Sequence, residues 1–193
     1  MVVRSPGFQP AGRAPAPAPL DLVQEFVNTE IPVWAIDDIA TPEALGIWLA
    51  ARGLLPAGAP VDSDSFVRAR ALRSVLRDLA RGHAEGRDPD DGLRAAFGAI
   101  SGSAPLRLEL DAAGAVRLEP DADGVDGALA AILARVHAAQ AAGLWRRLKS
   151  CPGPHCGWLF YDASRNASSR WCSMSICGNR TKTAAYRRRR RSS

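Results

Sequence analysis

Residues 151–180 read CPGPHCGWLFYDASRNASSRWCSMSICGNR and contain all four cysteines of the 193-residue chain. The cysteines form two C-x4-C pairs, Cys151 with Cys156 and Cys172 with Cys177, separated by fifteen residues. Two pairs of thiols at the ends of a short loop can close a tetrahedron around one zinc ion. The sequence therefore predicts one structural Zn²⁺ bound by the four cysteines.

A bound zinc ion would supply stability that this short segment cannot obtain from a core of its own. Residues 151–193 are too few to bury a self-sufficient core, whereas metal binding gives small zinc modules on the order of 10–16 kcal/mol. Aromatic residues between the cysteine pairs would fill a small core: Trp158, Phe160, Tyr161 and Trp171. We expect short strands at residues 157–162 and 169–174, and a helix after Gly178. Gly157 and Gly178 are expected to let the backbone turn toward the sulfurs.

Other roles for the cysteines stay open at this point. Two disulfides are disfavoured because the N-terminus lacks the apolar segment of a secretory signal, which predicts a reducing cytoplasm. A redox dithiol would usually show C-x2-C spacing. His155 could replace one cysteine, but it is adjacent to Cys156 and poorly placed to share the ion. A catalytic zinc needs an open coordination position, and four available thiols argue against one.

Positive charge is concentrated in the same segment. Residues 151–193 carry nine Lys or Arg and one acidic residue, a net +8, while the whole chain is +5 and residues 1–150 are therefore −3. This asymmetry predicts an anionic partner, with nucleic acid as the first candidate. The candidate contact residues are Arg165, Asn166, Arg170, Asn179, Arg180, Lys182, Arg187, Arg188, Arg189, Arg190 and Arg191.

These arginines also have structural interpretations. The chain has 23 Arg and two Lys, so part of the arginine content reflects composition. Arg180 could offset the −2 charge of a zinc tetrathiolate or pair with Asp162. Residues 187–191 could be a solvated tail, and Trp171 is expected in the core rather than stacked on a base.

The rest of the chain predicts a disordered lead-in followed by a mainly helical domain. Residues 1–19 are rich in Pro, Ala and Gly. Residues 20–148 show helical patterns, with a β-hairpin at 106–119 around Gly114. Helices are expected at residues 20–29, after Thr41, from Asp62–Asp64, after Asp88, and from 125 to 148. The fold class is mainly α with a small hairpin (α+β), followed by a zinc-stabilised module with short strands and a helix.

Several function classes lack support in the sequence. No apolar run reaches the roughly 18 residues that a membrane helix needs. No P-loop, dinucleotide fingerprint or nucleophile elbow is present, and we expect no enzymatic activity. Asn28 and Asp37 could line a ligand pocket or serve as caps and turns. His83 and His137 are isolated and fit satisfied or surface positions. The acidic-leaning domain suggests a sensor, or a dimerisation or protein-partner domain.

Two resemblances agree with this division of the chain. Residues 151–190, CPGPHCGWLFYDASRNASSRWCSMSICGNRTKTAAYRRRR, closely resemble the CGNR zinc finger. The preceding part resembles the ABATE domain through these residues: Phe26-Val27-Asn28-Thr29, Asp37, Thr41-Pro42-Glu43, Leu45 and Trp48-Leu49. The resemblance implies a bacterial transcription regulator with an ABATE-like domain at 20–148 and a DNA-binding zinc finger with a basic tail at 149–193. A zinc-containing protein-interaction module and an RNA-binding protein remain the alternatives.

Overall fold

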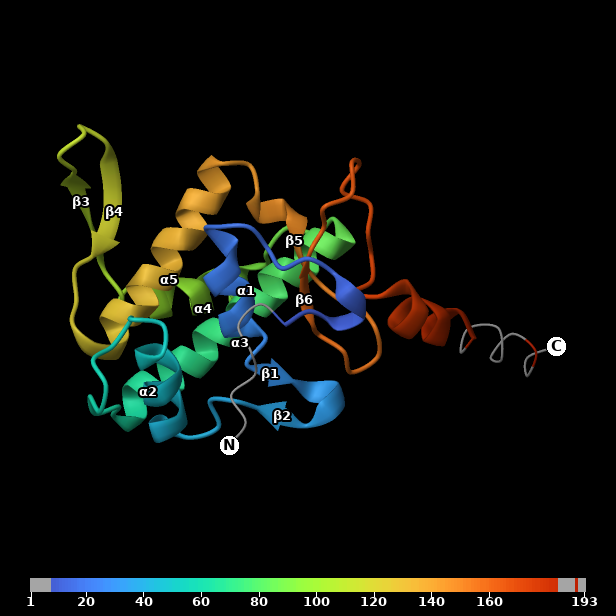
Figure 1. The fold of residues 1–193 in the computed structure, drawn as a ribbon, viewed down its shortest axis with the longest axis horizontal. Coiled ribbons are helices and arrows are strands. Elements are labelled where there is room, and N and C mark those ends of the chain that lie inside the picture. The colour runs from blue at the N-terminus through green and yellow to red at the C-terminus, as the bar shows by residue number, and fades with distance from the viewer. Residues whose placement is uncertain (1–7, 184–189, 191–193) are drawn as a thin grey trace.

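The computed structural model describes residues 8–183 and residue 190, and within them helices dominate (Figure 1). The helices are α1 (Leu20–Val27), α2 (Pro42–Ala50), α3 (Ser63–Glu85), α4 (Asp91–Ser101) and α5 (Gly124–Ala141). The strands form three antiparallel pairs, β1 (Glu30–Ile31) with β2 (Ile36–Asp37), β3 (Leu106–Leu110) with β4 (Val116–Pro120), and β5 (Leu148–Ser150) with β6 (Leu159–Tyr161). The predicted mainly helical fold with small strand pairs is confirmed.

Three helices begin at side-chain caps that the sequence predicts or nearly predicts. Thr41 accepts a hydrogen bond from the Ala44 amide at the start of α2, and Asp62 accepts one from the Ser65 amide at the start of α3. The helix expected after Asp88 begins slightly later, because Asp90 rather than Asp88 caps α4 through the Leu93 amide. Each cap satisfies an amide that has no partner within the helix, a contribution of about 1 kcal/mol.

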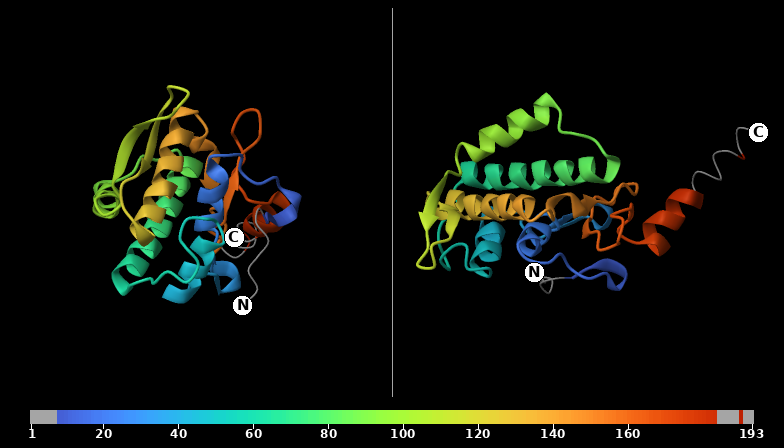
Figure 2. Two further views of the ribbon diagram at one scale, coloured as in Figure 1. Left: turned by 60° about the vertical axis from the view of Figure 1, so that its left-hand side comes forward. Right: turned by 90° about the horizontal axis from the view of Figure 1, so that it is seen from above.

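Helices α1, α3 and α5 pack around the main apolar core. The long helices α3 and α5 run in the same direction, with α1 against both (Figure 2). Phe26 of α1, Leu72 and Leu76 of α3, and Leu129 and Ile132 of α5 are fully buried. Burial of each such side chain stabilises the fold by about 1.5–3 kcal/mol, which makes this core the main source of stability for the helical part.

The predicted hairpin is present and projects beyond the helices (Figure 1). Its register pairs Leu108 with Leu118 and Leu110 with Val116, so one face of the ribbon is apolar. Asp111 shapes the turn by accepting hydrogen bonds from the Ala113 and Ala115 amides. The outer part of the apolar face stays open to solvent, since Leu108, Leu110 and Val116 are all more than 60% exposed.

The last helix of the domain ends earlier than its sequence pattern predicts. The prediction extended it to Leu148, but α5 stops at Ala141 and Gly143 adopts a positive φ of 69°. A 3-10 turn at Trp145–Arg147 then leads into β5. The reason is tertiary: Leu148 pairs with Tyr161 in the β5–β6 ladder, which an uninterrupted helix could not supply.

Two further predictions concern the segment that carries the cysteines. The strand expected at residues 157–162 is β6, whereas residues 169–174 form no strand in the described structure. A π-helical turn at Met174–Gly178 follows instead, and residues 179–183 continue as an α-helix, as predicted for the segment after Gly178.

Residues 8–19 are packed against the zinc module, which differs from the disordered lead-in predicted for residues 1–19. The Arg13 guanidinium donates to the carbonyls of Tyr161, Trp171 and Cys172 at 3.0–3.2 Å and lies 4.7 Å from the centre of the Phe160 ring. The Trp158 indole donates to the Gln9 side chain at 2.9 Å. Proline-rich composition therefore marks an extended strap here, held by side-chain contacts. Residues 1–7 lie outside the described part of the chain.

The helical part and the zinc module are joined by packed secondary structure, and no linker separates them within residues 8–183. The boundary predicted between residues 148 and 149 falls inside β5, and Leu148 and Leu159 belong to the main apolar core. Strand β5 packs on α3, and β6 lies beside α1. Within the described residues, no helix has both the length and the apolar character needed to cross a membrane.

Candidate metal centre and basic surface

The four cysteine sulfurs come together in one cluster. All four Sγ atoms lie within 4.8 Å of one another, and all four side chains are buried. The Sγ atoms of Cys156 and Cys172 are 3.7 Å apart, and those of Cys172 and Cys177 are 3.6 Å apart. Tetrahedral zinc with Zn–S bonds of about 2.3 Å requires sulfur–sulfur distances of about 3.8 Å. The donor set and its spacing therefore fit one structural Zn²⁺.

The local backbone directs amide groups at the sulfurs. Hydrogen bonds from the backbone of Gly153 and Cys172 reach Cys151, and one from Trp158 reaches Cys156. Gly153 and Trp158 each lie two residues after the cysteine they contact. Gly157 has a φ of +60°, which makes the second of these turns possible without steric strain. Such amide bonds orient thiolate ligands and stabilise their charge.

Two glycines here are closely packed, and neither has a positive φ. A Cβ atom on Gly153 would lie 3.1 Å from the sulfur of Cys177 and 3.3 Å from Cβ of Cys156. A Cβ atom on Gly178 would lie 2.4 Å from the sulfur of Met174. The sequence predicted a backbone-turn role for both Gly157 and Gly178. The positive φ of Gly157 fits that role, whereas Gly178 has no positive φ and is instead packed against the flexible side chain of Met174.

Without a cation, the cluster cannot hold four thiolates. Hydrogen bonds from the thiols of Cys156 and Cys172 lower the pKa of Cys151 to about 2. The interaction with Cys151 raises the pKa of Cys156 to about 12 and also raises the pKa of Cys172, and burial raises the pKa of Cys177. The four buried thiols therefore repel one another's ionisation. A divalent cation would relieve this repulsion and allow all four to bind as thiolates.

The cluster is enclosed by apolar side chains from both parts of the chain. Trp158 and Phe160 of the module pack with the cysteines, together with Ile31 of β1. Trp171 is partly buried against the same group, in agreement with its predicted core position. Four cysteine sulfurs are enough to fill a tetrahedral coordination sphere, as expected for a structural rather than a catalytic metal.

A buried ion pair fixes the loop between the cysteine pairs. Asp162 is fully buried and accepts hydrogen bonds from the Lys149 ammonium at 2.8 Å and from the amides of Ser164 and Ser169. Burial opposes ionisation of Asp162, but the bond from Lys149 and those from Ser164 and Ser169 outweigh it and hold the pKa of this carboxyl well below its usual range. The Lys149 ammonium also donates to the Ala167 carbonyl. Asp162 therefore pairs with Lys149, and the alternative pairing with Arg180 is wrong.

Lys149 makes a structural contact in the module that sequence reasoning missed. Its signal was available, since it is one of only two lysines in an arginine-rich chain. A compact ammonium can donate to several oxygens in a small space, which a planar guanidinium does less readily. Arg180, in contrast, lines a small cavity of about 50 Å³ together with Cys156, Cys172 and Cys177. That position is consistent with the charge-offsetting alternative for Arg180.

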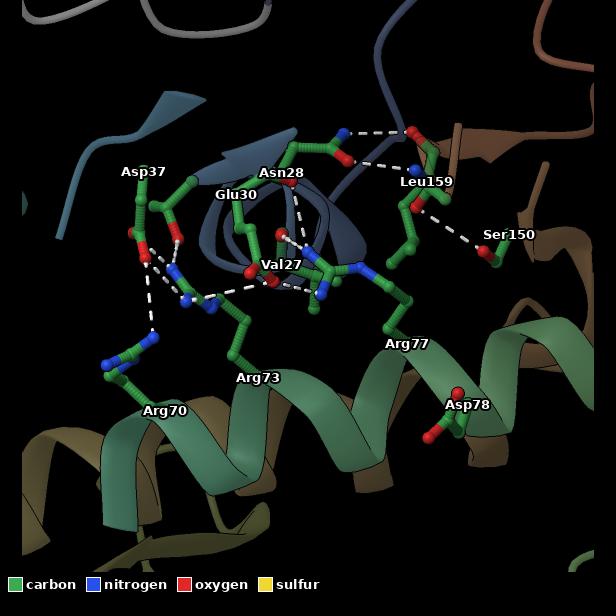
Figure 3. A network of polar contacts seen from close by, with 12 residues as sticks. Val27, Asn28, Glu30, Asp37, Arg70, Arg73, Arg77, Asp78, Ser150 and Leu159 are labelled. Atoms are coloured by element: carbon green, nitrogen blue, oxygen red, sulfur yellow. Dashed lines mark hydrogen bonds and ion pairs between the residues drawn. The ribbon is translucent and has the colours of Figure 1, made fainter. Parts of the chain in front are cut away.

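A second polar network joins α3 to the strands that cover the cysteine cluster (Figure 3). Arg73 donates to both oxygens of Asp37 at 2.6 and 2.9 Å and to the Thr29 hydroxyl at 3.1 Å. Arg77 donates to Glu30 at 2.5 Å and to the Val27 carbonyl at 2.7 Å. Asp37 is thus paired with the buried Arg73. Burial alone would raise the pKa of the Asp37 carboxyl, but the hydrogen bonds and positive charge of Arg73 outweigh it and lower the pKa below its ordinary value.

Asn28 connects the two parts of the chain directly. Its side chain donates to the Leu159 carbonyl at 2.9 Å and accepts from the Leu159 amide at 2.8 Å (Figure 3). The amide therefore acts as an extra partner for the edge of β6. Of the two interpretations of Asn28 and Asp37, the ligand pocket finds no support here, because both side chains are committed to internal contacts.

The predicted nucleic-acid contacts lie on two exposed segments of the module. Arg165, Asn166 and Arg170 belong to the loop between β6 and Cys172, and the Arg170 guanidinium lies 5.4 Å from the centre of the Trp171 ring. Asn179, Arg180 and Lys182 follow Cys177 on the C-terminal helix, and all six side chains are exposed. The loop rises above the module while the helix points away from the body (Figures 1 and 2). Arg190 is also exposed, and Arg187, Arg188, Arg189 and Arg191 lie outside the described residues.

Comparison with known families agrees with this division. Residues 20–147 match the ABATE family, described as "Putative stress-induced transcription regulator". The chain belongs to the ABATE family. Residues 147–190 match the CGNR zinc finger, so this ABATE protein carries both units that the sequence resembles. The two matches meet in the turn that leads into β5. A search of curated proteins gave no match.

Proposed function

We propose that this ABATE-family protein is a cytoplasmic transcription regulator, without enzymatic activity, that binds DNA through its CGNR module. The observation that carries the proposal is the exposure of basic side chains on the two segments that the cysteine cluster holds. Arg165 and Arg170 precede the third ligand, Cys172. Arg180 and Lys182 follow the fourth ligand, Cys177. Such charges bind phosphate and release counterions, which gives affinity that depends strongly on salt.

The zinc ion has a positioning role in this proposal. The loop is fixed by Lys149 and Asp162, and the C-terminal helix begins at the last ligand. Phosphate contacts gain when the cations are held in place before binding, because less side-chain entropy is lost. The exposed amides of Asn166 and Asn179 add groups that can contact phosphate or base edges.

One observation supports a protein partner as a second role, for the ABATE domain rather than the zinc module. The apolar face of the hairpin leaves Leu108, Leu110 and Val116 exposed next to each other in the β3–β4 ladder. Exposed apolar patches of this kind commonly mark association surfaces. Dimerisation through the hairpin would place two zinc modules on one nucleic acid, which suits a regulator. Sedimentation of the L108S/V116S variant beside the parent chain would test it, since only a hairpin-mediated dimer would shift to monomer.

A test of nucleic-acid binding must keep the chain intact. Truncation after residue 150 would remove Leu159 from the main core and leave β5 unpaired, so lost binding would report unfolding. We instead expect R180A/K182A to weaken binding to a DNA duplex about tenfold or more and to reduce the slope of log K against log salt by roughly 1.8. The matched control, R107A/R117A, removes two exposed arginines from the hairpin and should leave affinity unchanged.

Fluorescence anisotropy with zinc-loaded protein, run in parallel on duplex DNA and a structured RNA, makes the measurement. Equal losses in the two double variants would show that only net charge matters and would overturn the assignment to the module. Absence of affinity for either nucleic acid at low salt would favour the protein-interaction alternative, and tighter binding of RNA would favour the RNA-binding alternative.

A further inference from the structure

A large, partly open cavity lies in the ABATE domain, away from the cysteines. Its volume is about 1010 Å³, and it lies between α3, α4, α5 and the base of the hairpin. Its walls are mainly apolar, formed among others by Leu79, Leu93, Phe97, Leu106, Leu133 and Val136. Cavities that hold small ligands typically have volumes of about 300–1,000 Å³ and such apolar linings. Leaving this much apolar wall in contact with water is unfavourable, so an apolar occupant would stabilise the fold.

Helix α4 covers this cavity without closing it. Ile100 is the single fully buried residue of α4, whereas Leu93 and Phe97 line the cavity and are only partly buried. Helix α4 lies close to α3 at its Ser101 end and diverges from it toward its Asp91 end (Figure 2). The apolar side of α4 is therefore only partly covered by other side chains. The open end between α4 and α3 gives a ligand access to the cavity.

The polar groups at this cavity favour an anion. Arg94, Arg146, His83 and His137 belong to the lining, and no Asp or Glu of the described residues does. Arg146 is held only loosely, because Asp88 lies 3.7 Å away and both side chains are at least 80% exposed. A carboxylate could therefore replace Asp88 at little cost, since exposed ion pairs contribute about 0–1 kcal/mol.

The inner end of the cavity is connected to the zinc module. His83 lines the cavity, and its Nδ1 atom lies 2.9 Å from the Leu148 carbonyl. The His83 ring also packs edge-on against Trp145, another lining residue, with ring centres 5.1 Å apart. Leu148 begins β5, and Cys151 follows that strand directly. A group that moves His83 or Trp145 thus acts on the turn and strand that lead to the first metal ligand, since Leu148 lies three residues and Trp145 six residues before Cys151.

We propose that this cavity binds a small amphipathic anion, an apolar body with one carboxylate or similar acid group, and that its occupancy adjusts strand β5 and the zinc module through His83 and Trp145. The apolar body lies between α4 and α5, and the acid group binds Arg146 at the rim. Ligand binding is independent of the proposed function. Its regulatory consequence, a change in nucleic-acid affinity, rests on that function.

The ligand site is tested with 8-anilinonaphthalene-1-sulfonate, an apolar anionic fluorophore, on zinc-loaded full-length protein. We expect one probe per chain, displaced by dodecanoate, and weaker binding of a neutral naphthylamine of similar size. Q140W, which places bulk at a lining position of α5, should lower probe affinity at least tenfold, whereas A138W, at an exposed non-lining position of the same helix, should not. R146Q should weaken the anionic probe about fivefold with little effect on the neutral one, and R135Q, at an exposed α5 position outside the cavity, should change neither.

Equal effects of the two tryptophan variants would overturn the location of the site, and equal affinity for the anionic and neutral probes would overturn its chemical class. Hydrogen exchange then tests the coupling: dodecanoate should slow exchange of the amides of residues 148–151 in the parent chain but not in H83F, with each protein measured at a dodecanoate concentration that saturates it. Unchanged exchange in the parent chain would overturn the coupling. A chain that binds the probe and shows coupling but has no nucleic-acid affinity would overturn the proposed function alone.

Discussion

The helical part and the zinc module are held together in different ways, although they share a boundary. The helical core is built from aliphatic and aromatic side chains of α1, α3 and α5, and its members come from the whole length of residues 16–159. In the second cluster, four of the seven buried residues are cysteines, and one of the other three, Ile31, comes from outside the module. The comparison teaches that the module depends on a metal and on contacts supplied by the rest of the chain, whereas the main core is apolar throughout and takes only Leu148 and Leu159 from the β5–β6 pair.

Removal of one metal ligand is expected to give the largest effect. C172S takes away the sulfur that lies 3.6–3.7 Å from two others, so the site should lose its zinc and the C-terminal part should lose order. Small zinc modules owe on the order of 10 kcal/mol to the metal. Amide exchange over residues 148–183 should become fast, while most of the helical circular dichroism remains.

Added zinc should restore the metal-depleted parent chain but not C172S. Full protection of the module in metal-free, reduced protein would contradict the comparison, because the module would then be stable without its metal.

Core truncations in the two parts should separate stability from metal affinity. F160A and L129A both remove fully buried side chains, and each should lower the free energy of unfolding by about 2–5 kcal/mol. Only F160A touches the cluster around the cysteines, so only F160A should also speed zinc transfer to a competing chelator. Chelator kinetics and urea denaturation on the same samples provide the measurement. Equal zinc-transfer rates in the two variants would argue that the clusters are not distinct.

The connection between the parts is expected to have an intermediate effect. N28A removes both hydrogen bonds to Leu159 and leaves the buried Leu159 amide without this partner, whereas the Leu159 carbonyl keeps its hydrogen bond from Gln24. A buried polar group that loses its partner costs about 1–3 kcal/mol, so we expect a loss in that range. The matched variant N179A, at an exposed position of the module, should change stability by less than about 0.5 kcal/mol. A loss in N28A no larger than in N179A would show that the parts are joined elsewhere.

Acidification in a narrow range should give the smallest effect. Burial lowers the pKa of His83 below its ordinary value of about 6.5, so the unfolded chain binds more protons than the folded one below that pH. The stability that the folded chain gains from a neutral His83 is fully present above pH 6.5. It is lost as the pH falls through that value toward the folded pKa, by at most about 1.4 kcal/mol per pH unit. Urea midpoints at pH 7.5 and 5.8 should differ less in H83F than in the parent chain. H137Q, altered at an exposed histidine, should behave like the parent chain.

Prediction from sequence was most successful where a short pattern carries its own physical constraint. Cys151, Cys156, Cys172 and Cys177 assemble as their spacing predicts, because few arrangements of four thiols in a short segment can share one ion. The hairpin and the capped helices follow for a similar reason, since turn and cap residues act on their immediate neighbours. The end of α5 could not be predicted in this way. The segment up to Leu148 keeps a helical pattern, and the strand that begins there needs a partner strand, in which Leu148 pairs with Tyr161 thirteen residues further along.

The sequence by itself determined the zinc ligands, the helical class of the domain and the concentration of positive charge in the last 43 residues, because all three are local or additive properties of the chain. The tertiary structure alone decided which charges are committed and which are free to bind. Lys149 is buried with Asp162, and Arg73 and Arg77 are buried against Asp37 and Glu30, while Arg165 and Lys182 face solvent. The physical reason is that a charged side chain is buried only where a distant part of the chain supplies its counter-charge and hydrogen bonds, and residue order along the chain does not reveal that partner.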